Sequence, residues 1–247
     1  MDWDIFRIRA RKLAAIAAHP FRYAAFFRHG VVPAIEHNAV LRGLNFDFVV
    51  DVGANRGQFS LVCRRLRPAA AIMGFEPLPG PAQVYRQVFA ADPRVTLHEC
   101  ALAQTRGEMT MNISGRDDSS SLLPISKAQT DNFPGTGKVG LRRVITGPLP
   151  DFVQLSDLGV ANLLKIDVQG FELEVLKSAE SLLARFRWIY AECSFVPLYE
   201  GQALAEEIIA WLAARGFRLV GRFNPSHARK DGALLQADLL FENSKDA

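Results

Sequence analysis

Two different spacings of apolar residues divide the chain near residue 45. In residues 1–45 the apolar side chains recur every three or four positions, which predicts a helix ended by Pro20 and a second helix over residues 32–41. From Phe46 onward, short apolar runs typical of buried strands alternate with amphipathic stretches typical of helices. We therefore expect an N-terminal helical appendage, residues 1–45, followed by one domain, residues 46–247.

The second part of the chain is typical of an α/β sheet. The expected strands are residues 48–50, 71–75, 95–98, 108–113, 163–166, 188–193, 217–223 and 234–241. The expected helices are residues 57–66 and 81–89 and two later segments. One has Val175, Leu176, Ala179, Leu182 and Leu183 on one face, and the other has Leu204, Ile208, Trp211 and Leu212. Strands that alternate with helices favour a mostly parallel sheet with helices on both faces. The last two strands leave no room for a helical crossover, so one of them is expected to be antiparallel.

Residues 105–160 fit this alternation least well. Besides the strand at 108–113 they contain a polar stretch, G-R-D-D-S-S-S-L, and a Gly/Pro-rich stretch, N-F-P-G-T-G-K-V-G. Both stretches are predicted to be loops. Loops of this length inside a compact domain usually act as lids or binding segments.

The composition is typical of an intracellular globular protein. With 49% hydrophobic residues the chain can bury a sizeable core, and its net charge of +3 is too small for a nucleic-acid groove. Cys63, Cys100 and Cys193 show no C-x-x-C spacing, which disfavours a disulfide framework and a structural zinc site. The chain has neither an apolar run of membrane-spanning length nor a signal-peptide core, so we expect a cytoplasmic location.

A glycine turn follows the first strand in V-V-D-V-G-A-N-R-G-Q-F-S, residues 49–60, and such turns let a ligand approach the backbone. The dinucleotide motif G-x-G-x-x-G would need glycine at positions 53, 55 and 58, but Asn55 and Gln58 occupy two of them. No G-K-[ST] follows, which excludes a P-loop. The turn therefore lacks the known signatures of phosphate binding.

Carboxylates at the strand ends indicate a cationic ligand instead. Ligands of such sheets bind outside the carboxyl ends of the strands, where Asp51, Glu76, residues 99–101, Asp167 and Glu192 should meet. Asp51 precedes the turn, and Glu76 ends the second strand, where an acidic residue can accept hydrogen bonds from both ribose hydroxyls. A nucleoside with a positively charged tail fits these two carboxylates. S-adenosylmethionine is such a nucleoside.

These residues are part of a longer resemblance. Over residues 46–243 the chain resembles the FkbM family of S-adenosylmethionine-dependent methyltransferases, through F-V-V-D-V-G-A-N-R-G-Q-F-S, G-F-E-P, L-L-K-I-D-V-Q-G-F-E-L-E-V-L-K, A-E-C-S-F-V-P-L-Y-E-G and L-L-Q-A-D-L-L-F. The resemblance implies a class I methyltransferase (Rossmann-like) fold with a seven-stranded, mostly parallel sheet. It also implies methyl transfer to a hydroxyl oxygen of a sugar, a glycan or a small-molecule natural product.

The resemblance assigns parts of the cofactor to particular residues. The glycine turn with Asp51 is expected to frame the methionine portion, Glu76 to bind the ribose, and residues 100–101 to lie along the adenine. The serine-rich loop either closes over the cofactor or is a solvated loop. The candidate cofactor-binding residues are Asp51, Gly53, Asn55, Gly57, Gln58, Glu76, Pro77, Cys100, Ala101, Ser120 and Asp167.

Three residues are candidates for catalysis. Asp167 follows the strand at 163–166 and is expected to bind the cofactor, orient the acceptor or act as a general base. Glu192 ends the next strand at the same edge, and His227 lies between the last two strands. Glu172, in the first turn of a helix, fits a structural part as well as a functional one. No spacing of His, Cys, Asp or Glu requires a metal.

Two other functions compete with the O-methyltransferase. A nucleic-acid methyltransferase would usually carry an (N/D)-P-P-(Y/F) turn where this chain has D-V-Q-G, residues 167–170, so no nucleic-acid partner is expected. The other alternative is a non-catalytic S-adenosylmethionine-binding module. Residues 1–42 carry seven Lys and Arg against three Asp and Glu. This basic appendage is interpreted as a helical cover, a homodimer contact, or a contact with an anionic membrane or lipid-linked glycan.

Overall fold

The computed structural model describes residue 25 and residues 28–245. The first predicted helix lies outside the described residues, and so does most of the basic appendage, with its proposed dimer or membrane contacts. The predicted helix at 32–41 is later and shorter, because it consists of a 3₁₀ turn, η1 (Ile35–His37), followed by α3 (Asn38–Gly43). Pro33 disfavours helical backbone at the residue before it, which delays the helix.

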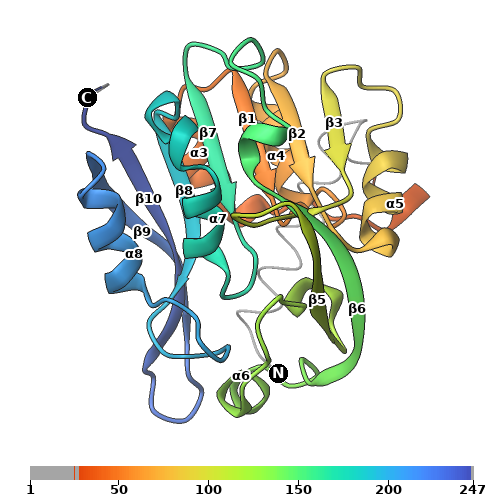
Figure 1. Ribbon diagram of the computed structural model, residues 1–247, viewed down its shortest axis with the longest axis vertical. Helices are drawn as coiled ribbons and strands as arrows, with labels where there is room; N and C mark the ends of the chain where they lie inside the picture. Colours follow the sequence, from red (N-terminus) through yellow and green to blue (C-terminus); the bar gives the residue numbers. More distant parts are fainter. Residues whose placement is uncertain (1–24, 26–27, 246–247) are drawn as a thin grey trace.

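Seven strands form the main sheet in the order β3-β2-β1-β7-β8-β10-β9 (Figure 1). Five of them run parallel, whereas β10 is antiparallel to both of its neighbours. The predicted class I methyltransferase fold, with one antiparallel strand near the C-terminus, is thereby confirmed. The strands are β1 (Phe48–Val52), β2 (Ala71–Phe75), β3 (Val95–His98), β7 (Asn162–Ile166), β8 (Trp188–Ser194), β9 (Phe217–His227) and β10 (Leu234–Asn243).

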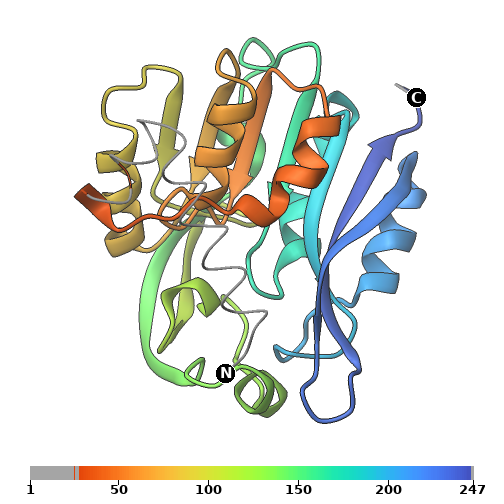
Figure 2. The ribbon, with the colours of Figure 1, turned by 180° about the vertical axis from the view of Figure 1, so that it is seen from behind.

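Helices cover both faces of this sheet (Figures 1 and 2). On one face α3, α4 (Gln58–Leu66) and α5 (Pro79–Val88) pack on the sheet, and on the other α7 (Glu172–Ser178) and α8 (Ala205–Ala213) do so. Every residue of β1 and β7 is buried, as expected of central parallel strands. Alternate residues of β1 serve the two faces: Val49 packs with Val62 of α4, and Val50 packs in the core that contains Leu176 of α7.

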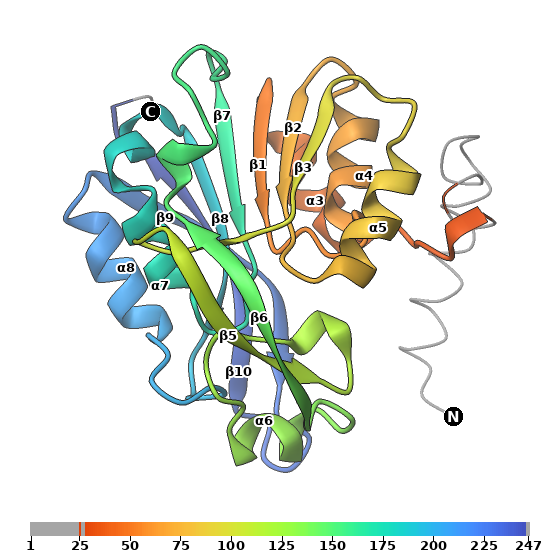
Figure 3. The same ribbon diagram turned by 45° about the vertical axis from the view of Figure 1, so that its right-hand side comes forward.

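A second, three-stranded sheet contains a strand that was not expected, since β6 (Lys138–Gly147) begins within the predicted Gly/Pro-rich loop. The polar stretch of residues 115–122 is a loop around the short turn η2 (Asp117–Ser119). The second sheet has the order β4-β6-β5, and it lies beyond the carboxyl ends of the main strands (Figure 3). Val139, Leu141 and Ile145 of β6 are 70%, 60% and 58% exposed, so backbone pairing with β5 keeps this strand extended without burial of its outer side chains. The sheet and the segments between its strands comprise β4 (Ala101–Leu102), β5 (Gly107–Ser114), η2 (Asp117–Ser119), α6 (Lys127–Asn132), β6 (Lys138–Gly147) and η3 (Leu149–Asp151).

The last part of the fold also differs in detail from the sequence expectation. Helix α7 gives way to a 3₁₀ segment, η4 (Glu180–Arg185), where one longer helix was predicted. Strand β9 continues through His227, which was predicted to lie in a loop. The chain pairs with β10 along this whole length, with register shifts.

The turns after β1 and β7 pack closely against each other at Gly53. Its φ is +74°, and a Cβ built there would lie 1.8 Å from the carbonyl oxygen of Asp167. We expect Gly53→Ala to lower the free energy of unfolding by more than about 2 kcal/mol, because the backbones must separate and the φ is strained. Urea denaturation measures this change.

Gly80→Ala is the matched control, since a Cβ added at Gly80 in α5 would extend into open space, with no neighbouring atom within 4 Å. This control should change stability by less than about 1 kcal/mol. Equal stabilities of the two variants would show that the turns can move apart.

Candidate active site

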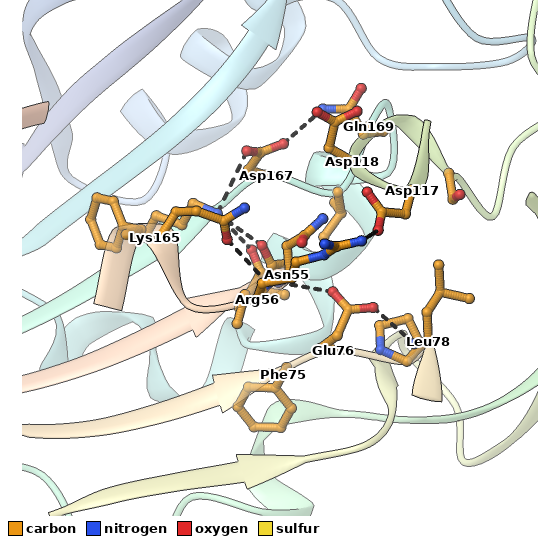
Figure 4. Close-up of a pocket in the computed structure, with 18 of the residues that line it drawn as sticks. Asn55, Arg56, Phe75, Glu76, Leu78, Asp117, Asp118, Lys165, Asp167 and Gln169 are labelled. Carbon is orange, nitrogen blue, oxygen red and sulfur yellow. Dashed lines mark hydrogen bonds and ion pairs between the residues drawn. The ribbon is translucent and has the colours of Figure 1, made fainter. Parts of the chain in front are cut away.

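A cavity of about 690 Å³ opens at the carboxyl ends of the parallel strands. Its walls come from the turn after β1, the end of β2, the start of β4, the loop around η2 and the turn after β7 (Figure 4). Residues between Gly30 and His37 close another side. The cavity therefore lies where ligands bind in open α/β sheets.

The turn after β1 presents an acceptor without a partner to this cavity. Asn55 has a φ of +45°, which Asn tolerates better than most residues, and Gly57 has a φ of +93° as the N-cap of α4. The side-chain oxygen Oδ1 of Asn55 is buried and has no hydrogen-bond partner among the described residues. Such an atom is costly unless a bound donor, such as an ammonium group, satisfies it.

Glu76 lies at the end of β2 and is 6% exposed. Its Oε2 accepts a hydrogen bond of 2.9 Å from the Asn55 amide, and its Oε1 accepts one of 2.8 Å from the Leu78 amide (Figure 4). Burial raises the pKa of this carboxyl to about 7. Two backbone amides thus fix the orientation of a carboxylate that lines the cavity, and its remaining lone pairs can accept from a diol.

A buried ion cluster forms the floor of the cavity. The ammonium of Lys165 lies 3.4 Å from Oδ1 of Asp51 and 3.6 Å from Oδ2 of Asp167, and it donates to the carbonyl of Gly53 at 3.1 Å. Asp51 is fully buried and also accepts a 2.6 Å hydrogen bond from Ser60. The structure thus places Asp51 below the cavity, whereas Asp167 and Lys165 line it. Two carboxylates against one ammonium leave this floor negative.

The turn D-V-Q-G after β7 is held by side chains from several elements. Gln169 has a φ of +58°; its Nε2 donates to Oδ1 of Asp167 at 2.8 Å and to Oε2 of Glu192 at 3.0 Å, and its Oε1 accepts from the Tyr199 hydroxyl at 2.8 Å. Glu192 therefore contacts Gln169 and does not itself line the cavity. Glu172 accepts from two amides of this turn, those of Val168 and Gly170, and burial raises its pKa to about 7. These contacts make Glu172 a support of the turn.

The serine-rich segment lies over the cavity near the glycine turn. Asp117 and Arg56 form an ion pair of 2.5 Å between the two segments (Figure 4). Ser120 lines the cavity, and its hydroxyl accepts from the amide of Ser114. Ser121 donates to the carbonyl of Gln169 at 2.6 Å. This segment is thus tied to both turns and is not a solvated loop.

The other sequence-predicted site residues are divided between the cavity and its surroundings. Cys100, Ala101, Pro77 and Gln58 line the cavity, and burial raises the pKa of the Cys100 thiol to about 12, so it offers a neutral, apolar surface. Gly53 also lines it, while Gly57 packs against Phe89 at its outer side. His227 is exposed at the end of β9, apart from the residues that line the cavity.

Four residues of the site were not expected to belong to it: Lys165, Gln169, Tyr199 and His37. A lysine inside a fully buried strand was a signal for Lys165, because such a charge needs nearby carboxylates. No local signal marks the other three, since most partners of their side chains lie far away in the chain; Asp167, two residues from Gln169, is the exception. In the described part of the chain, no three His, Cys, Asp or Glu side chains gather closely enough to hold a metal ion.

The site fits S-adenosylmethionine on chemical grounds. The nucleoside needs acceptors for its ribose hydroxyls and its amino group, and a negative surface for its sulfonium. Glu76, the unpartnered oxygen of Asn55 and the negative floor at Asp167 offer these features within one cavity. Fold and cavity together define a class I methyltransferase that uses S-adenosylmethionine.

The family follows from comparison with known proteins. Residues 51–219 match the model of the methyltransferase FkbM domain. The match covers more than half of the chain, and the chain belongs to this family of methyltransferases. The resemblance inferred from the sequence is confirmed.

Several named relatives are methyltransferases. The chain is 29% identical to 2-O-methyltransferase NoeI of Sinorhizobium fredii over 203 residues, which cover 80% of this chain and 79% of NoeI. It is 30% identical to methyltransferase sdnD of Sordaria araneosa, with 69% and 73% covered. It is 29% identical to 31-O-demethyl-FK506 methyltransferase FkbM of Streptomyces tacrolimicus, with 74% and 76% covered.

Solved structures resemble this chain more remotely. Magnesium protoporphyrin IX methyltransferase (ChlM) from Synechocystis, with bound S-adenosylmethionine, has a TM-score of 0.46 at 13% identity, with 90% of this chain and 81% of that chain covered. Precorrin-6y C5,15-methyltransferase from Geobacter metallireducens has a TM-score of 0.45 at 12% identity, with 85% and 87% covered.

Within the described residues, no helix is long and apolar enough to span a membrane.

The buried Glu76 predicts a pH dependence of stability. Its folded-state pKa of about 7 exceeds its usual value of 4.5, so the folded protein binds the proton more tightly than the unfolded chain. The stabilising effect of this proton is complete below pH 4.5 and is lost as the pH rises through 7. The free energy of unfolding should therefore fall as the pH rises from 4.5 to 8. We expect this fall to be smaller in Glu76→Gln, by up to about 3 kcal/mol.

Urea denaturation of both proteins between pH 4.5 and 8 measures the difference. Glu172 titrates in the same range in both proteins, so subtracting the two curves isolates Glu76. Parallel curves would mean that the Glu76 carboxyl has an ordinary pKa in the folded protein.

Proposed function

We propose that this methyltransferase transfers its methyl group to a hydroxyl oxygen of a sugar, a glycan or a small-molecule natural product. The observation that carries the proposal is the similarity of most of the chain to a 2-O-methyltransferase and to a 31-O-demethyl-FK506 methyltransferase. The cavity supports it, because its 690 Å³ lies in the range of pockets that enclose small ligands.

The cofactor residues have distinct proposed tasks. Glu76 would accept hydrogen bonds from the ribose hydroxyls, Asn55 would accept from the amino group, and Cys100 with Ala101 would provide the apolar surface for the adenine. Asp167 would offset the charge of the sulfonium and orient the acceptor, while Asp51 would act through Lys165. When bound, S-adenosylmethionine supplies a methyl group on a sulfonium that is already an excellent leaving group. The protein's main contribution is then to align the acceptor oxygen and to exclude water.

The turn after β7 argues against methylation of nucleic-acid base amines. It has the sequence D-V-Q-G, and Gln169 uses both of its amide hydrogens and its oxygen within the protein. The side chain of Gln169 is thus engaged in holding this turn to its neighbours. A non-catalytic binding module is disfavoured by the cost of the buried charges that line the cavity, such as Lys165.

Cofactor binding is tested by calorimetric titration. We expect S-adenosylhomocysteine to bind and NADH not to bind, since the glycine turn lacks the dinucleotide motif. Glu76→Ala should weaken S-adenosylhomocysteine binding by about 100-fold, because both ribose hydroxyls lose a charged acceptor. Unchanged affinity of Glu76→Ala would place the ribose elsewhere. Glu180→Ala, at an exposed position of η4, is the control.

Asp167→Asn separates binding from turnover. The amide keeps the size of the side chain but removes the negative charge next to Lys165. We expect a fall in kcat of about 100-fold and a change of less than about fivefold in S-adenosylhomocysteine affinity. The reverse pattern would make Asp167 chiefly a cofactor ligand.

The acceptor class is tested with a deuterated methyl donor. The protein is incubated with methyl-d3-S-adenosylmethionine and a panel of methyl hexopyranosides, methyl 6-deoxyhexopyranosides and macrolide alcohols, and mass spectrometry locates the label. We expect an O-linked methyl group on at least one of them. Labelling of tRNA, rRNA or DNA with no labelled alcohol would favour the nucleic-acid alternative.

A further inference from the structure

We propose that His37 is the general base that accepts the proton of the acceptor hydroxyl. This inference rests on the proposed O-methyl transfer. His37 is the last residue of η1, which precedes α3 and the first strand, and it lines the cavity. Its contacts with the rest of the protein orient the ring in the way that catalytic histidines are oriented.

Partners from three strands meet the Nδ1 side of His37. Nδ1 lies 3.0 Å from the Tyr190 hydroxyl of β8 and 3.5 Å from Oδ2 of Asp238 in β10. The Asn224 amide of β9 lies 3.2 Å from Nδ1. The contacts that the described residues make with the ring nitrogens of His37 all use Nδ1, which leaves Nε2 for a ligand.

The hydrogen-bond network favours a proton on Nδ1. The Tyr190 hydroxyl donates to Oδ2 of Asp238 at 2.9 Å, and burial raises the pKa of this tyrosine, so it keeps its proton. Its oxygen is then an acceptor for the Nδ1 hydrogen. The Asn224 amide donates to Oδ2 of Asp238 at 2.7 Å and to the Tyr190 hydroxyl at 3.2 Å, so both of its hydrogens have acceptors other than Nδ1. In this tautomer Nε2 carries the lone pair that a base needs.

The position of His37 suits the reaction. Its ring lies 5.2 Å from that of Phe59, and the same Phe59 ring lies under the ammonium of Lys165 at 5.7 Å. His37 and the ion cluster at the cavity floor thus border one aromatic side chain. Asp238 is paired in register with Glu192, so this group of residues lies on the side of the cavity beyond β7.

The other candidate bases are engaged or distant. Asp167 already has the Lys165 ammonium and the Gln169 amide as partners. Glu192 accepts from two amides, those of Gln169 and Gln236. His227 is exposed away from the cavity.

The proposed step is balanced in atoms and charge. As the acceptor oxygen forms its bond to the methyl carbon, its proton moves to Nε2 of His37, and the electron pair of the broken carbon–sulfur bond stays on sulfur. The imidazolium faces the carboxylate of Asp238, which stabilises its charge. The proton later passes to solvent. Asp238 and Tyr190 are positioning residues in this scheme.

The arrangement of the ring is tested first by NMR of the full, ¹⁵N-labelled chain with S-adenosylhomocysteine, using His37→Gln to assign the signals. We expect the Nδ1–H tautomer, with a bare Nε2. Asp238→Asn should shift the equilibrium toward the Nε2–H tautomer, which a purely structural change would not do. An Nε2–H tautomer in the unmodified protein would overturn the proposal.

The catalytic role is tested with the deuterated methyl donor and the alcohols of the panel. His37→Gln should lower kcat by about 100-fold or more while KM and S-adenosylhomocysteine affinity change by less than about threefold. His29→Gln, a histidine outside the cavity lining, is the matched control and should behave as the unmodified protein. A kcat of His37→Gln within about threefold of the control would overturn the proposal.

Failure of the two proposals can be distinguished. If the unmodified protein binds S-adenosylhomocysteine but methylates none of the alcohols, the proposed acceptor class fails, and the tautomer of His37 decides the second proposal. If His37→Gln loses S-adenosylhomocysteine binding, His37 is a cofactor-site residue and not the base. Asp238→Asn, which leaves the cavity lining intact, provides a second variant: normal affinity with lowered kcat supports the proposal, and normal kcat contradicts it.

Discussion

The ammonium of Lys165 holds together the two turns on which the site depends. The Lys165 side chain is only 8% exposed in a central strand, where it lies between Asp51 of β1 and Asp167 after β7 and donates to the carbonyl of Gly53. Taking such charges out of water is expensive, and removal of one partner from a buried pair typically costs about 3–5 kcal/mol. The cluster therefore fixes the spacing of the turns, and with it the positions of Asn55 and Asp167 in the cavity.

Much of the fold could be predicted because it is encoded locally. Central parallel strands are buried on both faces, so their apolar runs stand out, and β1, β2 and β7 were found within two residues of their ends. Strand β6 could not be found in this way, because its outer side chains are exposed and its partner strand lies about 30 residues earlier. Its extended form comes from pairing, which sequence periodicity does not report.

Part of the cavity lining could be predicted from the sequence. Glu76 ends a strand, and the structure places it in the cavity wall, where two backbone amides donate to it. Asp51 also ends a strand, but its side chain lies below the cavity, because the direction of a strand-end side chain depends on its packing. His37 gave no signal at all, since its partners Tyr190 and Asp238 are 153 and 201 positions further along the chain.

The contact between His37 and Asp238 joins a segment made before the first strand to one in the last strand. During synthesis on the ribosome, the residues of β1, β2 and the glycine turn are made long before those of β10. The Nδ1 side of His37 therefore gains its carboxylate partner only after β10 has joined the sheet.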